Sequence, residues 1–358
     1  MRFIVDTYLP FDTGGTEAMV QLAISLRHTV PAPHEACIWR RRLHPRFYDE
    51  YPNITNVPTV HMKEVLESNE TRPGDVIIAP DVRSNWCGPQ IARQPGVVLY
   101  LYVLSSVNLR RLSYYSAKYP GRCRFLYHSW RLHNLSRAED DPNSSLPLRP
   151  YISPSIVAYC RANRLCQSRS GSESERAHCA EALALPPHLG STELPRRPLV
   201  LLDSDTTNEI RYFANRACNH SACDVVRVTR KSRKEVKALL LSASIVVDWC
   251  MVGTERLPVE AALCGAVILT SSCEQGGGAD TRDFPMPARN VLRHPSELVV
   301  AITRVLQNLR TERDAQLELV DLYDTGTSAY TLDLEVDRAV ATMLRLHGDQ
   351  SRTADLAL

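Results

Sequence analysis

Apolar runs and helical spacings alternate along most of this chain. Residues 3–5, 76–79 and 97–103 are continuous apolar runs, which is typical of strands buried on both faces of a parallel sheet. Between Glu17 and His28 the apolar residues instead recur at helical spacing. Further strands are predicted at 36–39, 124–127, 199–202 and 225–228, and further helices at 156–164, 208–219, 234–241, 296–309 and 332–346. This alternation predicts an α/β protein with parallel sheets.

The clearest strand–helix–strand pattern runs from Ser244 to Ser272. Residues 245–247 and 266–269 are predicted as two buried strands, and Pro258 suits the first turn of the helix between them. Gly265 is predicted to end that helix. The loop after the first strand therefore lies at the carboxyl edge of a parallel sheet, where open α/β folds bind ligands.

Composition divides the chain into two α/β domains. Residues 167–198 are rich in Ser, Pro and charged residues, and we interpret them as a linker or surface excursion. The first domain is predicted over 1–166, and the C-terminal helix at 331–347 could pack against this domain. The second domain is predicted over 199–330, and 348–358 as a disordered tail. Two such domains would face each other across a cleft.

Bulk properties exclude several classes of protein. Apolar residues make up 44% of the chain and charged residues 23%, with a net charge of +2 and no long basic run. Nucleic acid is therefore not expected as a partner. No apolar stretch approaches the roughly 18 residues that a membrane span needs. A cytoplasmic location is the default expectation.

The eleven cysteines contain no C-x-x-C pair, and we interpret them as reduced, mostly buried thiols. Structural zinc at Cys218 and Cys223 is the less favoured alternative, because no second close pair is visible. Five N-x-S/T sequons keep a lumenal location open, namely those of Asn53, Asn69, Asn134, Asn143 and Asn219.

Two glycine-rich loops are candidate anion sites. Gly14 and Gly15 lie between the first strand and helix, where the backbone can approach a ligand near a helix N-terminus. A plain tight turn explains them equally well. Residues 276–278 are three successive glycines after the strand at 266–269, a pattern that suits N–H groups turned toward an anion. The alternative there is a flexible loop.

Charged residues gather near the helix that contains Pro258. Glu260, one turn into this helix, could accept hydrogen bonds from paired sugar hydroxyls, or be a carboxylate favoured by the helix dipole. Arg256 could contact phosphate or pair with Glu255. Arg230 and Lys231 could add positive charge, or be solvated.

Elsewhere, His128 ends an apolar strand, where a structural role is more common than a substrate role. Asp203-Ser-Asp205 has the letters of a metal-binding D-x-D motif, but it lies at the start of the second domain, and we interpret it as a chance match.

At these residues the chain resembles nucleotide-sugar glycosyltransferases of the GT-B fold, and is most similar to the retaining family 4, or group 1, enzymes. That family has a glycine pair after the first strand, here Gly14-Gly15-Thr16-Glu17, and an E-G-F-G-L-P-x-x-E-A-like segment, here the residues 252–261. A closer likeness is to glycosyltransferase-like bacterial proteins with a G-K-D-R-I-P-R-E-A-A segment, which residues 253–262 follow almost position for position.

The resemblance implies roles for particular residues. Glu260 would bind the ribose of the donor, Gly277 and Gly278 would line the diphosphate, and Gly14 and Gly15 would face it from the other domain. The family's first glutamate is Val252 here, unless Glu255 replaces it.

The Arg/Lys pair expected after the first strand of the second domain is also absent. Arg230, Lys231 or Arg256 would then have to stabilise the leaving diphosphate, with Glu255, Arg256 and Arg230 as the catalytic candidates.

The sequence therefore predicts two Rossmann-like domains and transfer of a sugar from a nucleotide donor, with retention, to a carbohydrate, lipid-linked or protein acceptor. No cofactor or metal is expected beyond the nucleotide sugar. One alternative is a catalytically inactive domain that binds a nucleotide sugar or a protein partner. The other is a different enzyme on the same fold, such as a sugar-nucleotide epimerase; a phosphorylase would need a longer chain.

Overall fold

The computed structural model describes residues 1–7, 14–39, 47–48, 51–60, 74–81, 96–104, 109–136, 148, 197–229, 231, 233–251, 256–272, 283–323 and 332–355. The chain forms two compact units. One unit combines Met1–Tyr151 with Ala329–Leu358, and the other is Ile152–Ser328. Among the described helices none is long and apolar enough to cross a membrane.

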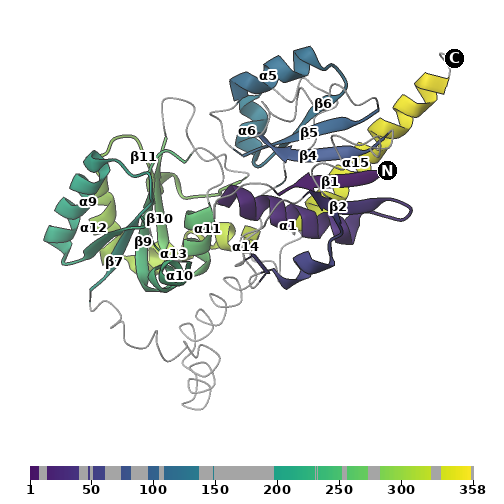
Figure 1. The fold of residues 1–358 in the computed structure, drawn as a ribbon. Helices are drawn as coiled ribbons and strands as arrows, with labels where there is room; N and C mark the ends of the chain where they lie inside the picture. Colours follow the sequence, from purple (N-terminus) through teal and green to yellow (C-terminus); the bar gives the residue numbers. More distant parts are fainter. Residues whose placement is uncertain are drawn as a thin grey trace. The chain divides into compact units, whose positions relative to one another are not determined.

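The first unit contains a six-stranded parallel sheet in the order β3-β2-β1-β4-β5-β6 (Figure 1). Its strands are β1 (Arg2–Asp6), β2 (Glu35–Trp39), β3 (Thr59–Val60), β4 (Val76–Pro80), β5 (Val98–Val103) and β6 (Cys123–Tyr127). Its helices are α1 (Gly14–Thr29), the 3₁₀ turn η1 (Pro52–Asn56), α5 (Leu109–Lys118), α6 (Trp130–Leu135) and α15 (Leu332–Asp355). This is the strand order of dinucleotide-binding folds, and its order reverses between β1 and β4.

Alternate residues of these strands enter two hydrophobic layers. Phe3 and Val5 pack in one layer with α1 and with Val336 and Val340 of α15. Ile4 lies between them in sequence but packs on the opposite face, with Tyr115 of α5. Because a strand's side chains point alternately to the two faces, a continuous apolar run is what a sheet covered on both faces requires.

The second unit contains a five-stranded parallel sheet in the order β11-β10-β9-β7-β8. Its strands are β7 (Leu199–Leu202), β8 (Asp224–Arg227), β9 (Ala243–Asp248), β10 (Val267–Ser271) and β11 (Val291–Leu292). Its helices are α9 (Asn208–Ser221), α10 (Arg233–Ser242), α11 (Arg256–Leu263), the turn η5 (Ala288–Asn290), α12 (Glu297–Gln307), α13 (Leu309–Asp314) and α14 (Leu317–Tyr323). The strand order here reverses between β7 and β9.

Helices cover both faces of this second sheet as well. Helices α9 and α12 lie side by side on one face, where Ile210 and Ile302 pack against Val247 (Figure 1). Helices α10, α11 and α14 supply the layer on the other face, which includes Val246 and Leu319. As predicted, Gly265 follows the end of α11, and its φ of 91° is the left-handed conformation that glycine adopts without penalty.

Gln316 completes the hydrogen bonding of β10. Its buried amide accepts from Ile268 N at 2.8 Å and donates to Ala266 O at 3.2 Å, whereas β11 pairs only with Thr270 and Ser271. The Gln316 side chain therefore makes the hydrogen bonds to β10 that a longer β11 would make.

We expect Gln316→Leu to lower the free energy of unfolding of the second unit by about 2–4 kcal/mol, because two buried backbone groups lose their partners. Urea denaturation followed by hydrogen exchange of the β10 amides measures this. Leu317→Gln, at the exposed neighbouring position, is the control and should change stability by less than about 0.5 kcal/mol.

The interpretation of all the cysteines as reduced thiols is wrong. Cys218 and Cys223 form a disulfide, and Cys250 and Cys264 are disulfide-bonded too, whereas Cys37 and Cys123 are free and buried. The reason at the first pair is local: Ala222 ends α9 in a left-handed conformation, so the chain reverses and the two Cα atoms come within 4.5 Å. Helical spacing alone would not bring residues five apart together.

Candidate functional site

The carboxyl ends of β9 and β10 are polar and closely tied together. Asp248 ends β9 and Ser271 ends β10, and both side chains are buried. The Cys250 N–H donates to Ser271 Oγ at 2.9 Å, and Cys250 itself has a φ of 64°. A non-glycine residue in this conformation is uncommon and is found preferentially where the surroundings fix the backbone, as at ligand sites. The start of the β9–α11 loop is thus held rigidly at the sheet edge.

Helix α11 opens from this loop with a buried ion pair. Arg256, its first residue, donates to Glu260 Oε1 at 2.5 Å, and the two side chains are only 13% and 3% exposed. Every other residue of α11 is apolar. A buried pair costs desolvation energy that apolar residues of the same size would avoid. Such a pair at the carboxyl edge of a sheet is therefore a candidate for function.

The structure pairs two of the predicted site residues, Arg256 and Glu260. The sequence suggested Glu255 as an internal partner of Arg256, and the structure shows a pairing with Glu260, because residues four apart lie on one face of a helix. Glu260 lies one turn after Arg256, and its Oε1 accepts from the Arg256 guanidinium. Five other residues of interest, Glu255, Arg230, Gly277, Gly278 and Val252, lie outside the described residues.

The neighbouring strands β7 and β8 contribute one carboxylate and one cation. Asp203 follows β7, and its N–H donates to Val247 O of β9 at 3.2 Å. Arg227 ends β8 and donates through Nε to Ser204 O at 3.0 Å. Arg227 therefore places a cation at this edge, which the sequence analysis did not select. Its position near the end of the predicted strand 225–228 could have identified it. Lys231, by contrast, is exposed and forms a surface pair with Glu235 at 3.4 Å.

Burial, together with a hydrogen bond to the Asp205 carboxyl, raises the pKa of Asp203 to about 6. The folded pKa is above the usual 3.8, so the folded protein binds this proton more tightly than the unfolded chain does. The associated stability is present below pH 4 and is lost as the pH rises through 6.

We therefore expect Asp203→Asn to stabilise the second unit at pH 7–8, by up to about 3 kcal/mol, and to change nothing at pH 3.5. Thermal denaturation across this pH range measures the difference. Asp321→Asn, at an exposed position of α14, is the control. If Asp203→Asn raised the stability of the second unit equally at both pH values, the raised pKa of Asp203 would be contradicted.

The carboxyl edge of the first sheet has its own buried polar groups. Gly14 and Gly15 are the first two residues of α1, so the helix begins three residues earlier than Glu17 and the glycines lie at its N-terminus instead of in the loop before it. Glu17, in the first turn, accepts a hydrogen bond from the Tyr51 hydroxyl, and Gln21 donates to the same hydroxyl at 2.8 Å. This network orders the start of α1.

Three strand ends add to that edge. Asp6 at the end of β1, Asp81 directly after β4 and His128 directly after β6 are all buried. Asp81 accepts from Leu104 N at 3.3 Å, and the His128 ring lies 5.8 Å from that of Tyr102. Asp6 and Asp81 flank the point where the strand order reverses, which is where such sheets bind ligands. Sequence reasoning selected His128 but missed both aspartates, which only the strand order identifies.

Within the part of the chain that the structure describes, no three His, Cys, Asp or Glu side chains lie close enough together to hold a metal ion. The Cys218–Cys223 disulfide also removes that pair as zinc ligands.

Comparison with known proteins identifies the type of fold. No protein-family model matches the chain, and no curated protein is significantly similar to it. Its structure resembles that of a putative UDP-N-acetylglucosamine 2-epimerase from Listeria monocytogenes, with a TM-score of 0.53 and 11% sequence identity over 98% of this chain and 97% of that one.

Two other structures are less similar. One is a UDP-GlcNAc 2-epimerase from Neisseria meningitidis bound to UDP-GlcNAc, with a TM-score of 0.45 and 12% identity over 96% of this chain and 99% of that one. The other is an alpha1,3-fucosyltransferase with GDP, with a TM-score of 0.37 and 10% identity over 97% and 90%. The likeness to the Listeria protein, together with the two parallel sheets, confirms the predicted α/β fold of two Rossmann-like domains.

Proposed function

We propose that this protein binds a nucleotide sugar at the carboxyl edge of the second sheet and transfers its glycosyl group to an acceptor hydroxyl, with retention. The observation that carries the proposal is the Arg256–Glu260 ion pair, which links the first residue of α11 to the buried carboxylate one turn later. The resemblance implies that Glu260 binds the donor ribose. The Cys250–Ser271 hydrogen bond ties the residues after β9 to the end of β10 at the same sheet edge.

Each group has a defined task in this proposal. The carboxylate of Glu260 would accept hydrogen bonds from the ribose hydroxyls, with Arg256 holding it in orientation. The helix N-terminus beside it favours the negative diphosphate. When the bond from the sugar's anomeric carbon to the diphosphate breaks, the charge that develops on the diphosphate would be stabilised by cations at this edge. The candidate cations are Arg256, Arg227 and Arg230. Glu255 would contact the donor sugar, and Gly277 and Gly278 would line the phosphates.

The reaction needs no group beyond the two substrates. The acceptor oxygen forms the new bond to the anomeric carbon on the face that the diphosphate leaves, which retains the configuration. The diphosphate leaves with the electron pair, and its departing oxygen takes up the acceptor proton. Rate enhancement would come from positioning and from stabilisation of the departing charge. Lys231 is a weaker candidate for this charge, since it is paired with Glu235 at the surface.

A second candidate is epimerisation of a nucleotide sugar. It is supported by the likeness in fold, over nearly the whole chain, to a protein named as a putative UDP-N-acetylglucosamine 2-epimerase. Binding without turnover is the remaining alternative, and Val252 together with the Arg/Lys-free loop after Leu202 is the sequence evidence for it. All three candidates share the binding step.

The test is a panel of UDP-, GDP- and ADP-sugars, scored by thermal shift, by release of nucleotide and by the configuration of the recovered sugar. Transfer predicts release of nucleoside diphosphate when an acceptor is present. Epimerisation predicts a sugar of unchanged mass whose configuration differs from that of the substrate. Binding without turnover predicts a thermal shift and no product. If no nucleotide sugar shifts the melting temperature, the proposal fails.

A matched pair of variants locates the site. Glu260→Gln should weaken binding about tenfold or more, because hydrogen bonds to a charged group are lost. Glu235→Gln removes an equivalent charge from an exposed helical pair and should leave binding unchanged.

A further inference from the structure

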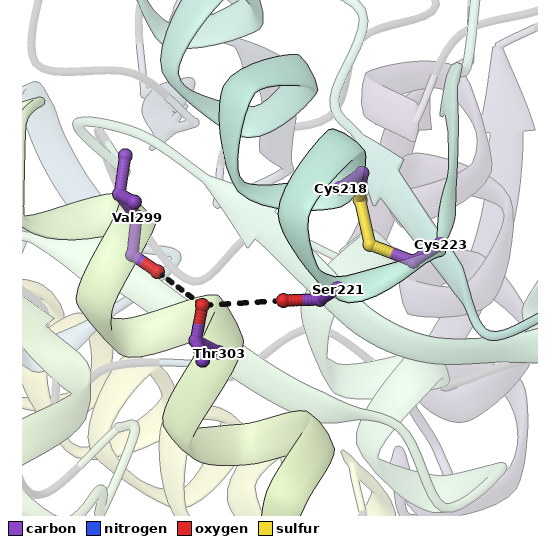
Figure 2. The surroundings of a disulfide bond; sticks show 5 residues. All are labelled: Cys218, Ser221, Cys223, Val299 and Thr303. Atoms are coloured by element: carbon purple, nitrogen blue, oxygen red, sulfur yellow. Dashed lines mark hydrogen bonds between the residues drawn. A yellow bond between two sulfur atoms is a disulfide. The ribbon is translucent and has the colours of Figure 1, made fainter.

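A disulfide bond closes the C-terminal end of helix α9. Figure 2 shows Cys218, in the last turn of the helix, joined to Cys223 just before β8. Cys250 and Cys264 are disulfide-bonded as well, so four of the six cysteines in the described part of the chain are oxidised. Disulfides persist in oxidising compartments and are rare where glutathione and thioredoxin keep thiols reduced.

One sequon lies inside this disulfide loop. Asn219-His220-Ser221 is enclosed by the two bonded cysteines. The side chain of Asn219 is exposed, while its neighbour Cys218 is buried. The Ser221 hydroxyl is directed at α12, 3.2 Å from Thr303 Oγ1, which donates to Val299 O at 2.8 Å (Figure 2). The serine and the cysteines thus anchor the loop, and the asparagine faces solvent.

Two further sequon asparagines are exposed. Asn53 lies in the 3₁₀ turn η1, and Asn134 lies in the last turn of α6. A glycan is bulky and hydrophilic, so an acceptor asparagine must lie at the surface of the folded protein. All three sequon asparagines that the structure describes meet this condition.

We propose that the chain passes through an oxidising, glycosylating compartment and carries N-linked glycans at Asn219, Asn53 and Asn134. The disulfides supply the evidence for the oxidising compartment, and the exposed sequons identify the modification. This replaces the default expectation of a cytoplasmic location and does not depend on the proposed sugar transfer.

The test uses the full chain from the cells that make it, with free thiols blocked by N-ethylmaleimide before lysis. Peptides are then treated with peptide N-glycosidase in water enriched in heavy oxygen. We expect Asn219, Asn53 and Asn134 to be recovered as aspartate carrying heavy oxygen, and Cys218 to be recovered linked to Cys223. Asn208, an exposed asparagine at the other end of α9 that is not in a sequon, should remain unlabelled.

Variants made in the same cells separate modification from folding. Asn219→Gln and Ser221→Ala should each remove one glycan from the intact mass, whereas Ser221→Thr preserves the sequon and should keep it. Cys218 and Cys223 blocked by N-ethylmaleimide without reduction would overturn the proposal. Intact disulfides with no heavy oxygen at any of the three asparagines would also overturn it.

Discussion

Arg256→Met is expected to destabilise the second unit by about 3–5 kcal/mol, because it removes the guanidinium that balances the charge of the buried Glu260 carboxylate. The Glu260 side chain is only 3% exposed, so water cannot replace the guanidinium without opening α11. Since the chain has two units and need not unfold in one step, hydrogen exchange of the β9 and β10 amides is the appropriate measurement.

The double variant Arg256→Met/Glu260→Leu distinguishes a functional pair from a structural one. Removing both charges should recover much of the lost stability, because apolar residues of similar size pay no desolvation cost. Nucleotide-sugar binding should not recover. A double variant no more stable than Arg256→Met would show that the pair is needed for folding.

Asp75→Ala is expected to lower the free energy of unfolding of the first unit by about 3–5 kcal/mol. Asp75 is fully buried at the start of β4 and accepts from Arg2 N at 3.1 Å and from the Arg2 guanidinium at 2.6 Å. It therefore joins the first residue of β1 to the neighbouring strand. Hydrogen exchange of the β1 and β4 amides measures the loss.

Two comparisons make this prediction specific. Arg2→Met should cost less than Asp75→Ala does, because the backbone N–H at position 2 can still donate to the carboxylate. Amides of β9 and β10, in the other unit, should exchange as in the wild type. If both variants exchanged as the wild type does, the pair would contribute nothing to stability.

Continuous apolar runs made the central strands predictable. The runs at 3–5, 76–79, 199–202 and 245–247 all lie within observed strands, because strands covered on both faces must be apolar throughout. Strands β3 and β11 were not predicted, since two residues carry no pattern. Helix α5 was missed because its sequence has a low mean hydropathy and its apolar positions are interrupted by arginines. The predicted helix at 156–164 lies outside the described residues.

The sheet edge of the second unit was predictable from the sequence, but the contacts within it were not. The position of Pro258 and Gly265 around an apolar helix located the sheet edge, and the structure has both where they were expected. Contacts within the edge depend on three-dimensional neighbours that spacing does not reveal. The Arg227–Ser204 contact joins two strand ends 23 residues apart, and the Cys250–Ser271 bond joins two others. The Cys218–Cys223 disulfide depends on the left-handed conformation of Ala222, which is not a residue that favours it.

The most direct test of nucleotide-sugar binding at the second sheet is hydrogen exchange of the full chain, with and without the nucleotide sugar that gives the largest thermal shift. Protection is predicted at the carboxyl edge, in residues 248–251, 256–260 and 270–272, and it should be lost in Glu260→Gln but retained in Glu235→Gln. Protection confined to other parts of the chain, with exchange in these three segments unchanged at saturating ligand, would contradict the account.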